Sequence, residues 1–309
     1  MAGAAIFRVA TIRRRAWLER VETPPLPAAQ RQALASLLDD SAPAVRQMLL
    51  THFAGLGTEG TLFLREVACG SNRVLAGHAA WFLHELKCAD PVADFRGFIR
   101  SQHYELESGA LLLARTVRPE LDAGACCTQL DALAARVRAL LPAAATAREQ
   151  CRVLNRVLFT EAGFRGNEEN YTDPRNSFLD QVLARRTGLP VSLAIVYLLV
   201  AGRTGIELAP VGAPGRFLVG CYCDAEPFFI DVFAGGEFLS AGAVFALLRA
   251  ADLNPQISDL APTPVREVFC RCCRNLVNHY TAAHEPELAQ LFAGFVAEFE
   301  AVHGRPAQS

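Results

Sequence analysis

The sequence has almost no lysine, because Lys87 is the only lysine among its 30 lysine and arginine residues. A phosphate-binding P-loop needs a Gly-Lys pair, and the chain contains none, so nucleotide chemistry of that type is excluded. No G-x-G-x-x-G motif follows a predicted strand, which removes the usual fingerprint of a dinucleotide site. Arginine replaces lysine throughout the chain, and we attribute this bias to composition rather than to recognition.

Long apolar runs and a strong net charge are also missing. The longest apolar run, Leu189–Ala201, is too short to cross a bilayer and suits a buried helix. A formal charge of −2 gives no reason to expect nucleic acid or an anionic membrane as a partner. With 51% hydrophobic and 20% charged residues, the chain has the composition of a globular protein.

No secretory signal is recognisable in residues 1–29, which form a basic segment. Arg8 interrupts a short apolar stretch there, and Arg13 to Arg15 follow. Residues 1–18 contain no acidic residue, so a transit peptide is one interpretation of this segment. The arginine bias of the whole chain favours the other interpretation, a basic N-terminus without a targeting role. The ten cysteines are irregularly spaced, so we expect reduced thiols in a cytoplasmic protein.

Residues 30–145 show helical periodicity, with glycines between short amphipathic segments. The predicted buried stripes are Leu34, Leu37 and Leu38, then Val45, Met48, Leu49 and Phe53, then Leu62, Phe63 and Val67, and then Val74, His78, Phe82 and Leu86. Asp90 and Pro91 make a good N-cap and first-turn pair for a fifth helix. Such consecutive short helices predict a stacked, HEAT-like helical region.

The pattern changes in residues 146–261, where strands follow two helices. Asp173 and Pro174 begin a helix that Gly188 ends, and Pro190 then opens an apolar helix that reaches about Gly205. The runs typical of strands are Ile206–Val211, Phe217–Cys223 and Phe228–Phe233, with a hairpin turn over residues 224–227.

Residues 262–309 close the chain with two more helices. They begin at Thr263-Pro264 and at Pro286, and together resemble one tetratricopeptide-like helix pair. The predicted fold class is therefore α+β: a helical N-terminal array, a core of antiparallel strands around a buried helix, and a C-terminal helical hairpin.

His84, Glu85 and Cys88 form an H-E-x-x-C sequence close to a zinc-binding motif. His84 and Cys88 would lie one turn apart on a helix, but no third ligand accompanies them. We therefore interpret both as packing residues and expect neither a metal nor another cofactor.

The stretch from Asn170 to Gly236 closely resembles the SirB-type branch of the transglutaminase-like superfamily. The matching residues, in order, are Asp173-Pro174-Arg175-Asn176-Ser177, Arg185-Arg186, Gly188, Pro190, Pro214-Gly215 and Asp231. The resemblance implies a transglutaminase-like core over residues 146–261, and that family also ends in a tetratricopeptide-like helix pair. It also implies a bacterial kind of protein, with similar domains occurring beside F-box modules.

Active members of that superfamily use a cysteine at a helix N-terminus, a histidine as base and an aspartate that orients the imidazole. Carried over by position, the nucleophile is replaced by Pro190 and the base by Arg216, while Asp231 remains. A guanidinium stays protonated and cannot act as a base, so we expect Arg216 to pair with Asp231. Ser192 lies about 200° around the helix from Pro190 and is no ready substitute.

Two functions remain open on this basis. The first is a pseudoenzyme that acts as a protein-interaction or regulatory module, with a protein partner and no nucleic acid or membrane. The second is a hydrolase or acyltransferase of altered mechanism, in which Arg216 binds a carboxylate or an oxyanion. The candidate polar site for the second consists of Asn170, Tyr171, Asp173, Arg185, Arg186 and Ser192.

Overall fold

The computed structural model describes residues 26–40, 42–70, 72–86, 88, 90–223 and 226–303. Most of the predicted basic segment, residues 1–25, lies outside the described residues, as do residues 224 and 225 of the predicted hairpin turn. The chain divides into two compact units, one up to Cys88 and one from Ala89 onward. The domain boundaries drawn from the sequence, at residues 145 and 261, stay predictions.

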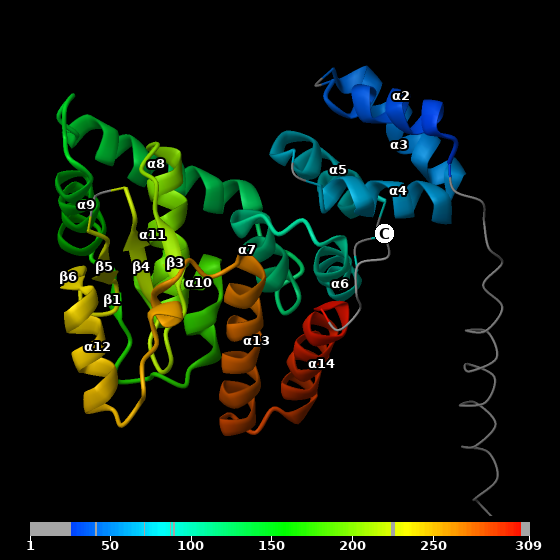
Figure 1. The fold of residues 1–309 in the computed structure, drawn as a ribbon. Coiled ribbons are helices and arrows are strands. Elements are labelled where there is room, and N and C mark those ends of the chain that lie inside the picture. Colours follow the sequence, from blue (N-terminus) through cyan, green and yellow to red (C-terminus); the bar gives the residue numbers. More distant parts are fainter. Residues whose placement is uncertain are drawn as a thin grey trace, which may run out of the picture. The chain divides into compact units, whose positions relative to one another are not determined.

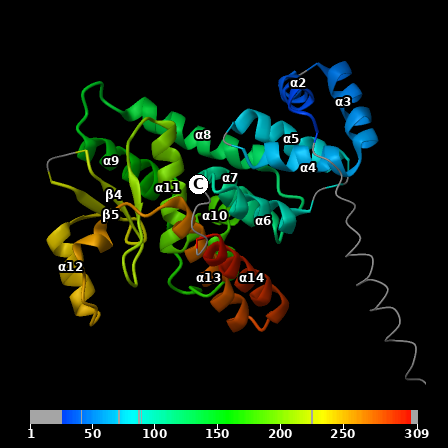
Figure 2. The same cartoon turned by 45° about the vertical axis from the view of Figure 1, so that its right-hand side comes forward.

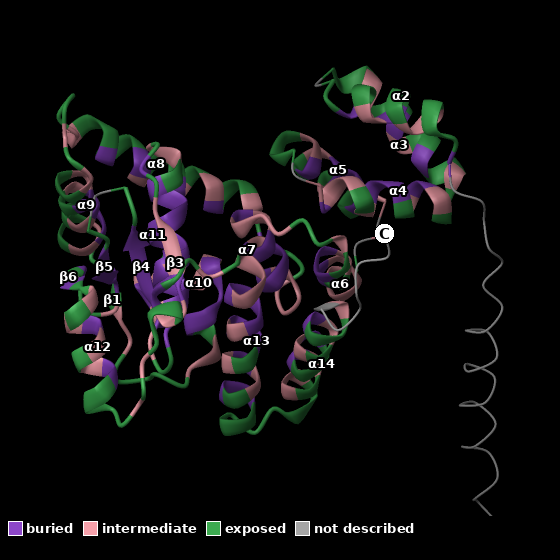
Figure 3. Cartoon of the chain, in the orientation of Figure 1, coloured by how far each residue is buried: buried purple, intermediate pink, exposed green. Residues whose placement is uncertain are grey.

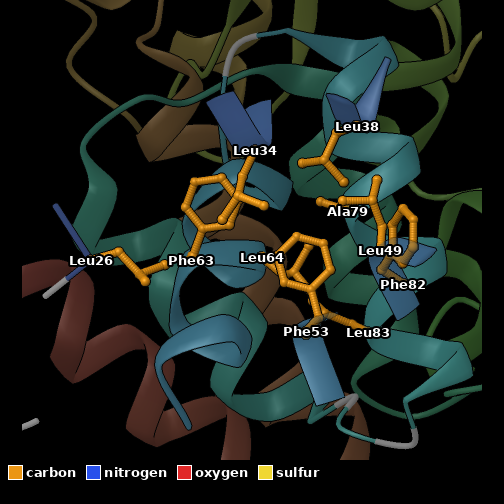
Figure 4. Close-up of a cluster of buried hydrophobic side chains, with 10 residues drawn as sticks. All are labelled: Leu26, Leu34, Leu38, Leu49, Phe53, Phe63, Leu64, Ala79, Phe82 and Leu83. Carbon is orange, nitrogen blue, oxygen red and sulfur yellow. The ribbon is translucent and has the colours of Figure 1, made fainter. Parts of the chain in front are cut away.

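In its described residues, the first unit consists of four short helices. They are α2 (Ala28–Leu38), α3 (Pro43–Leu56), α4 (Thr58–Ala68) and α5 (Arg73–Glu85). Their shared core is built from Leu26, Leu34, Leu38, Leu49, Phe53, Phe63, Leu64, Ala79, Phe82 and Leu83, drawn as sticks in Figure 4. The Phe53 ring meets Phe82 edge-on at 5.5 Å between centroids, which joins α3 to α5.

The predicted stripes of this unit were wrong at four positions. Leu37, Met48, Leu62 and Val74 are exposed, and Leu64 and Leu83, which the stripes left out, are fully buried. Each error is a shift of one or two positions around a helix. An apolar residue beside the buried stripe fits the period almost as well as its neighbour, and only packing against the other helices decides between them.

The second unit combines helices with two small sheets (Figures 1 and 2). Its first helices are α6 (Pro91–Ser101), α7 (Leu106–Arg115), α8 (Ala123–Leu140) and α9 (Ala147–Asn155). As predicted, Asp90 caps α6 by accepting a hydrogen bond from the Ala93 backbone N–H at 3.0 Å, and Pro91 follows in the first turn. A π-helical turn, Arg156–Glu161, extends α9.

Four antiparallel strands form the main sheet, in the order β3–β4–β5–β6. They are β3 (Ala209–Val211), β4 (Leu218–Cys221), β5 (Phe228–Asp231) and β6 (Glu237–Ser240). Each of the three predicted strands is present in shortened form. The sequence analysis assigned no element to β6 or to the following helix α12 (Ala241–Ala250). A separate parallel pair joins β1 (Arg165–Gly166) to β2 (Thr187–Gly188).

The predicted helix from Pro174 to Gly188 is broken into parts. Asp173 caps a 3-10 helix, η2 (Pro174–Ser177), and Phe178 adopts extended backbone angles before α10 (Leu179–Arg185) begins. Arg186, with φ of 58°, ends α10, so Gly188 is free to join β2. The break changes the direction of the backbone between η2 and α10. The apolar residues on both sides of it fit one helical period, so the sequence pattern did not show the break.

Helix α11 (Pro190–Arg203) is the centre of the second unit. All eleven residues from Val191 to Ala201 are buried, which confirms the predicted burial of this segment (Figure 3). Strands β3 and β4 contact α11, and so do α7, α8, α10 and α13 (Val265–Ala282). At its C-terminal end, Arg203 pairs with buried Glu107 and with Asp131, each at 2.7 Å, which ties α11 to α7 and α8.

The chain ends in α13 and α14 (Pro286–His303), which pack closely against each other. Helix α14 also meets α6, where the rings of Phe95 and Phe295 lie 4.9 Å apart. A helical C-terminal pair is therefore present, and the structure as a whole has the predicted α+β class. Among the described residues, no helix combines the length and hydropathy that a membrane span requires.

Gly109 in α7 provides a test of this packing. A Cβ there would overlap the rings of Phe269 and Phe98, so Gly109→Ala should destabilise the second unit by about 1–3 kcal/mol. Gly294→Ala in α14 is the matched control, because nothing lies within 4 Å of its Cβ position and the change should stabilise the helix by about 0.5–1 kcal/mol. Urea unfolding followed by far-UV circular dichroism measures both; equal effects of the two substitutions would contradict the packing.

Candidate functional site

Asp231 ends strand β5 and uses both carboxylate oxygens within the protein. Its Oδ2 accepts a hydrogen bond from Arg216 Nη1 at 2.9 Å, which confirms the predicted ion pair. Its Oδ1 accepts from the backbone N–H groups of Phe233 and Ala234, each at 3.1 Å. The Asp231 side chain is 8% exposed and that of Arg216 is 39% exposed. The carboxylate therefore fixes the turn after β5 as well as the guanidinium.

Ser192 closes the N-terminus of α11. Its Oγ donates to the Asn176 carbonyl at 2.6 Å and accepts from the Leu189 backbone N–H at 2.9 Å. The hydroxyl is buried, and these two bonds use its one donor hydrogen and one of its two acceptor lone pairs. Ser192 is therefore a capping residue in this structure. Pro190 opens the helix, and its approach to Arg216 and Asp231 stays a prediction.

Asn176 holds together the loop that precedes it. Its amide nitrogen donates to the Asn170 carbonyl at 2.7 Å and to the Tyr171 carbonyl at 3.3 Å. Its amide oxygen accepts from Asn167 Nδ2 at 2.9 Å and from Arg185 Nη1 at 3.4 Å. The side chain is fully buried, so each of these bonds replaces one that water would make in the unfolded chain.

Asp173 is the charged centre of the same loop. It forms ion pairs with Arg175 at 2.9 Å and with Arg185 at 3.1 Å, and it caps η2 by accepting from the Arg175 backbone N–H. Burial raises its pKa, but the hydrogen bonds and charges of Arg175 and Arg185 outweigh burial and lower the pKa overall.

The structure thus brings most of the predicted polar site together around Asn176. Asn170 and Tyr171 contribute backbone carbonyls, Arg185 contributes its guanidinium, and Ser192 reaches it from α11. Arg186 lies apart, with its guanidinium over the Phe164 ring at 4.7 Å from the centroid, and burial lowers its pKa.

His279 is a residue that the sequence analysis missed. It was not among the predicted site residues, but α13 carries His279 against Tyr171, with ring centroids 6.2 Å apart. The residue is 5% exposed, and its Nδ1 has no hydrogen-bond partner among the described residues. Burial lowers its pKa, and the charge of Asp173 partly opposes that shift. His279 lies three residues after the buried Leu276 on α13. This helical spacing was the feature of the sequence from which its burial could have been predicted.

All ten cysteines lie within the described residues, and none of them is in a disulfide. Burial raises the pKa of Cys151 and of Cys272 to about 12, which keeps both protonated at neutral pH.

The described residues also contain no cluster of three or more potential metal ligands. His84 is largely exposed and pairs with Glu85, while the Cys88 thiol donates to the Leu86 carbonyl.

A family model described as the transglutaminase-like superfamily matches residues 124–274. A UPF0162 protein of Xylella fastidiosa is 37% identical over 182 residues, which is 57% of this chain and 64% of the relative. The chain thus spans slightly less than two thirds of that relative's length. A UPF0162 protein of Pseudomonas aeruginosa is 31% identical over 183 residues, covering 59% of this chain and 67% of the relative.

A shorter match joins the chain to F-box only protein 21 of Mus musculus. The two are 40% identical over 80 residues, which is 26% of this chain and 13% of the relative. No solved structure matches the chain.

Asn176→Ala should destabilise the second unit by about 1–3 kcal/mol, because it removes the hydrogen bonds of a fully buried amide and leaves Asn167 Nδ2 without its acceptor. Asn170→Ala is the control: its side chain is exposed, and the change should stay within about 0.5 kcal/mol. The urea midpoints of the two variants are measured by circular dichroism. Trp81 fluorescence is not used because Trp81 lies in the first unit and does not report on the second. A loss below 1 kcal/mol for Asn176→Ala would show that water replaces these bonds.

His279 should make stability depend on pH. Because burial lowers its pKa in the folded state, the unfolded chain binds the extra proton. Stability is then fully present above the unfolded value of about 6.5 and falls as the pH drops below it, by at most about 1.4 kcal/mol per pH unit. In His279→Gln, the urea midpoints measured at pH 7.5 and at pH 5.5 should lie closer together than in the wild type. His103→Gln changes an exposed histidine and should keep the same difference between the two midpoints as the wild type.

Proposed function

We propose that this chain, which belongs to the UPF0162 family and carries a domain of the transglutaminase-like superfamily, acts as a non-catalytic protein-interaction module. One observation carries the proposal: the aspartate that would orient a catalytic imidazole instead holds a guanidinium at 2.9 Å and caps the turn that follows it. Arg216 keeps its proton at any physiological pH, so the pair transfers no proton.

The other residues of the predicted site support the same conclusion. The Ser192 hydroxyl is hydrogen-bonded at the start of α11. Arg185 forms an ion pair with Asp173 and a hydrogen bond to Asn176. Pro190 supplies no nucleophile at the position that the resemblance assigns to cysteine. Each retained polar residue stabilises the local fold, which is the pattern expected where a domain keeps its architecture after losing its chemistry.

The helical parts of the chain are the proposed binding surfaces. We assign α13 and α14 to a tetratricopeptide-like pair and residues 30–145 to a HEAT-like array, as the sequence patterns predict. The match to an F-box only protein covers 13% of that relative, so a similar segment is used there beside other sequence. Ten cysteines, none of them in a disulfide, support a reducing, cytoplasmic location for this activity.

A second candidate function rests on His279. A buried imidazole with an unpartnered Nδ1 beside Tyr171 has the form of a general base, so a hydrolase or acyltransferase of altered mechanism is the alternative. It would need a nucleophile or an activated water close to that ring, and the hydroxyl of Ser192 is engaged elsewhere. The interaction module therefore accounts for more of the structure.

Activity-based probes separate the two functions. In a Cys223→Ser background, which removes the exposed thiol, fluorophosphonate and peptidyl-epoxide probes should leave the folded chain unlabelled. The double variant Pro190→Cys, Arg216→His is the positive control, because it restores a thiol at the start of α11 and a histidine beside Asp231. Labelling of the Cys223→Ser protein at one residue, lost in His279→Gln, would establish the enzyme instead.

The interaction role has its own test. Cross-linking of the tagged chain in its host, followed by identification of the linked residues, should give reproducible cross-links from α13, α14 or the first unit to another protein. A host in which the chain forms only internal cross-links would contradict the proposal.

A further inference from the structure

Helix α9 carries three exposed arginines on one face, Arg148, Arg152 and Arg156, which we call the arginine stripe. They follow one another at intervals of four residues, so successive side chains are rotated by only about 40° around the helix. Arg156 keeps helical backbone angles where α9 ends, so it stays in line with the other two. Three guanidinium groups therefore occupy about 12 Å of one helix face, at intervals of about 6 Å.

This alignment is unfavourable for the helix itself. Like charges four residues apart repel each other and destabilise a helix. Arg148 also lies in the first turn of α9, where the helix dipole disfavours a cation. The arginine-rich composition accounts for the number of arginines in the chain, but not for three of them on one exposed helix face. The missing element is a counter-charge.

Two of the three arginines form no ion pair with a carboxylate of the described residues, namely Arg148 and Arg152. Glu149 lies three residues before Arg152, but its carboxylate accepts from the backbone N–H and from the hydroxyl of Thr146, each at 2.8 Å. These hydrogen bonds are the main cause of the lowered pKa of Glu149, and the charge of Arg152 contributes least. Glu149 thus acts as a capping residue of α9.

Glu161 is the carboxylate at the other end of the stripe. It pairs with Arg156 at 2.8 Å and with Arg136 of α8 at 2.7 Å. One negative charge is thus shared between two guanidinium groups, whose side chains remain 60% and 50% exposed. Positive charge is therefore in excess here as well.

Two aromatic rings hold the first arginine of the stripe. The Arg148 guanidinium lies 4.6 Å from the centroid of Phe228 and 5.2 Å from that of Phe238, on the neighbouring strands β5 and β6. A cation that is already oriented in this way loses less conformational freedom when it binds an anion. Helix α9 lies at one edge of the second unit, away from α13 and α14 (Figures 1 and 2).

We propose that the arginine stripe binds an extended acidic segment of a partner polypeptide, with acidic side chains at every second position. Alternate residues of an extended chain lie about 6.6–6.8 Å apart on one side, close to the spacing of the stripe. Each planar guanidinium can offer two parallel N–H groups to one carboxylate. The site lies on α9, outside the binding surfaces assigned above, and it does not depend on whether the core is catalytic.

A polypeptide fits this surface better than a nucleic acid does. The chain has a formal net charge of −2, so it has no general attraction for a polyanion. Glu161 beside Arg156 would also repel a continuous row of phosphates, whereas a short acidic segment can end before it.

Fluorescence anisotropy of a fluorescein-labelled peptide tests this binding with the full chain. The peptide carries three glutamates at alternate positions, separated by serines, and a matched peptide carries three glutamines. The chain should bind the glutamate peptide about thirtyfold more tightly, because three exposed ion pairs contribute about threefold each. The difference should shrink as the salt concentration rises, since exposed charges are screened.

Arg152→Gln should lower the affinity for the glutamate peptide about threefold, because it removes one ion pair. Arg249→Gln makes the same change of charge at an exposed arginine of α12 and should bind like the wild type. In Arg152→Glu the preference should reverse at the central position: a peptide with lysine in place of the central glutamate should bind this variant more tightly than it binds the wild type. Circular dichroism confirms that each variant is folded.

A glutamate peptide that binds no more tightly than the glutamine peptide would overturn the proposal. An equal loss of affinity in Arg152→Gln and Arg249→Gln would overturn it too, because the effect would then be one of net charge alone. Labelled oligouridylate that binds more tightly than the glutamate peptide, and more weakly to Arg152→Gln than to the wild type, would replace the polypeptide by a single-stranded nucleic acid.

Discussion

The enclosure of α11 is the constraint on which the second unit depends. Eleven consecutive buried residues leave this helix no face for water, so every neighbouring element must present apolar surface to it. Its two ends must then satisfy their polar groups within the protein. Ser192 does this at the start by accepting from the Leu189 N–H, and at the end Arg138 donates to the Arg203 carbonyl and the Thr204 hydroxyl donates to the Ala201 carbonyl.

The same constraint orders the loop that leads into α11. The Asn176 amide arranges the 167–171 backbone, and the same residue receives the Ser192 hydroxyl through its carbonyl. The loop and the helix start are therefore one hydrogen-bonded unit. Proline suits the first position of α11 because that position needs no backbone donor. Asn176 and Ser192 thus serve to close the start of this helix.

The sequence predicted the parts of this structure that rest on local chemistry. Pro190 and the apolar run behind it predicted a buried helix, Asp90 predicted a cap, and apolar runs bounded by turn residues predicted three of the four strands of the main sheet. The ion pair of Arg216 with Asp231 followed from the resemblance and from charge.

Features set by long-range packing were not predictable in the same way. His279 reaches the loop of Tyr171 only because α13 packs against η2, and nothing in the residues around either one records that contact. The break at Phe178 and the short strand β6 depend on neighbours distant in the chain. Leu62 and Leu64 have the same side chain and lie two residues apart, yet one is exposed and the other fully buried.

The Arg216–Asp231 pair also bears on how the domain can evolve. Under the correspondence proposed for this site, a return to thiol chemistry needs a cysteine at position 190 and a histidine at position 216. The cysteine alone would have no base, and the histidine alone would give up a permanent positive charge beside Asp231 and gain no nucleophile. Under that correspondence neither single substitution restores catalysis, so the guanidinium at position 216 makes a return to thiol chemistry difficult to reach one substitution at a time.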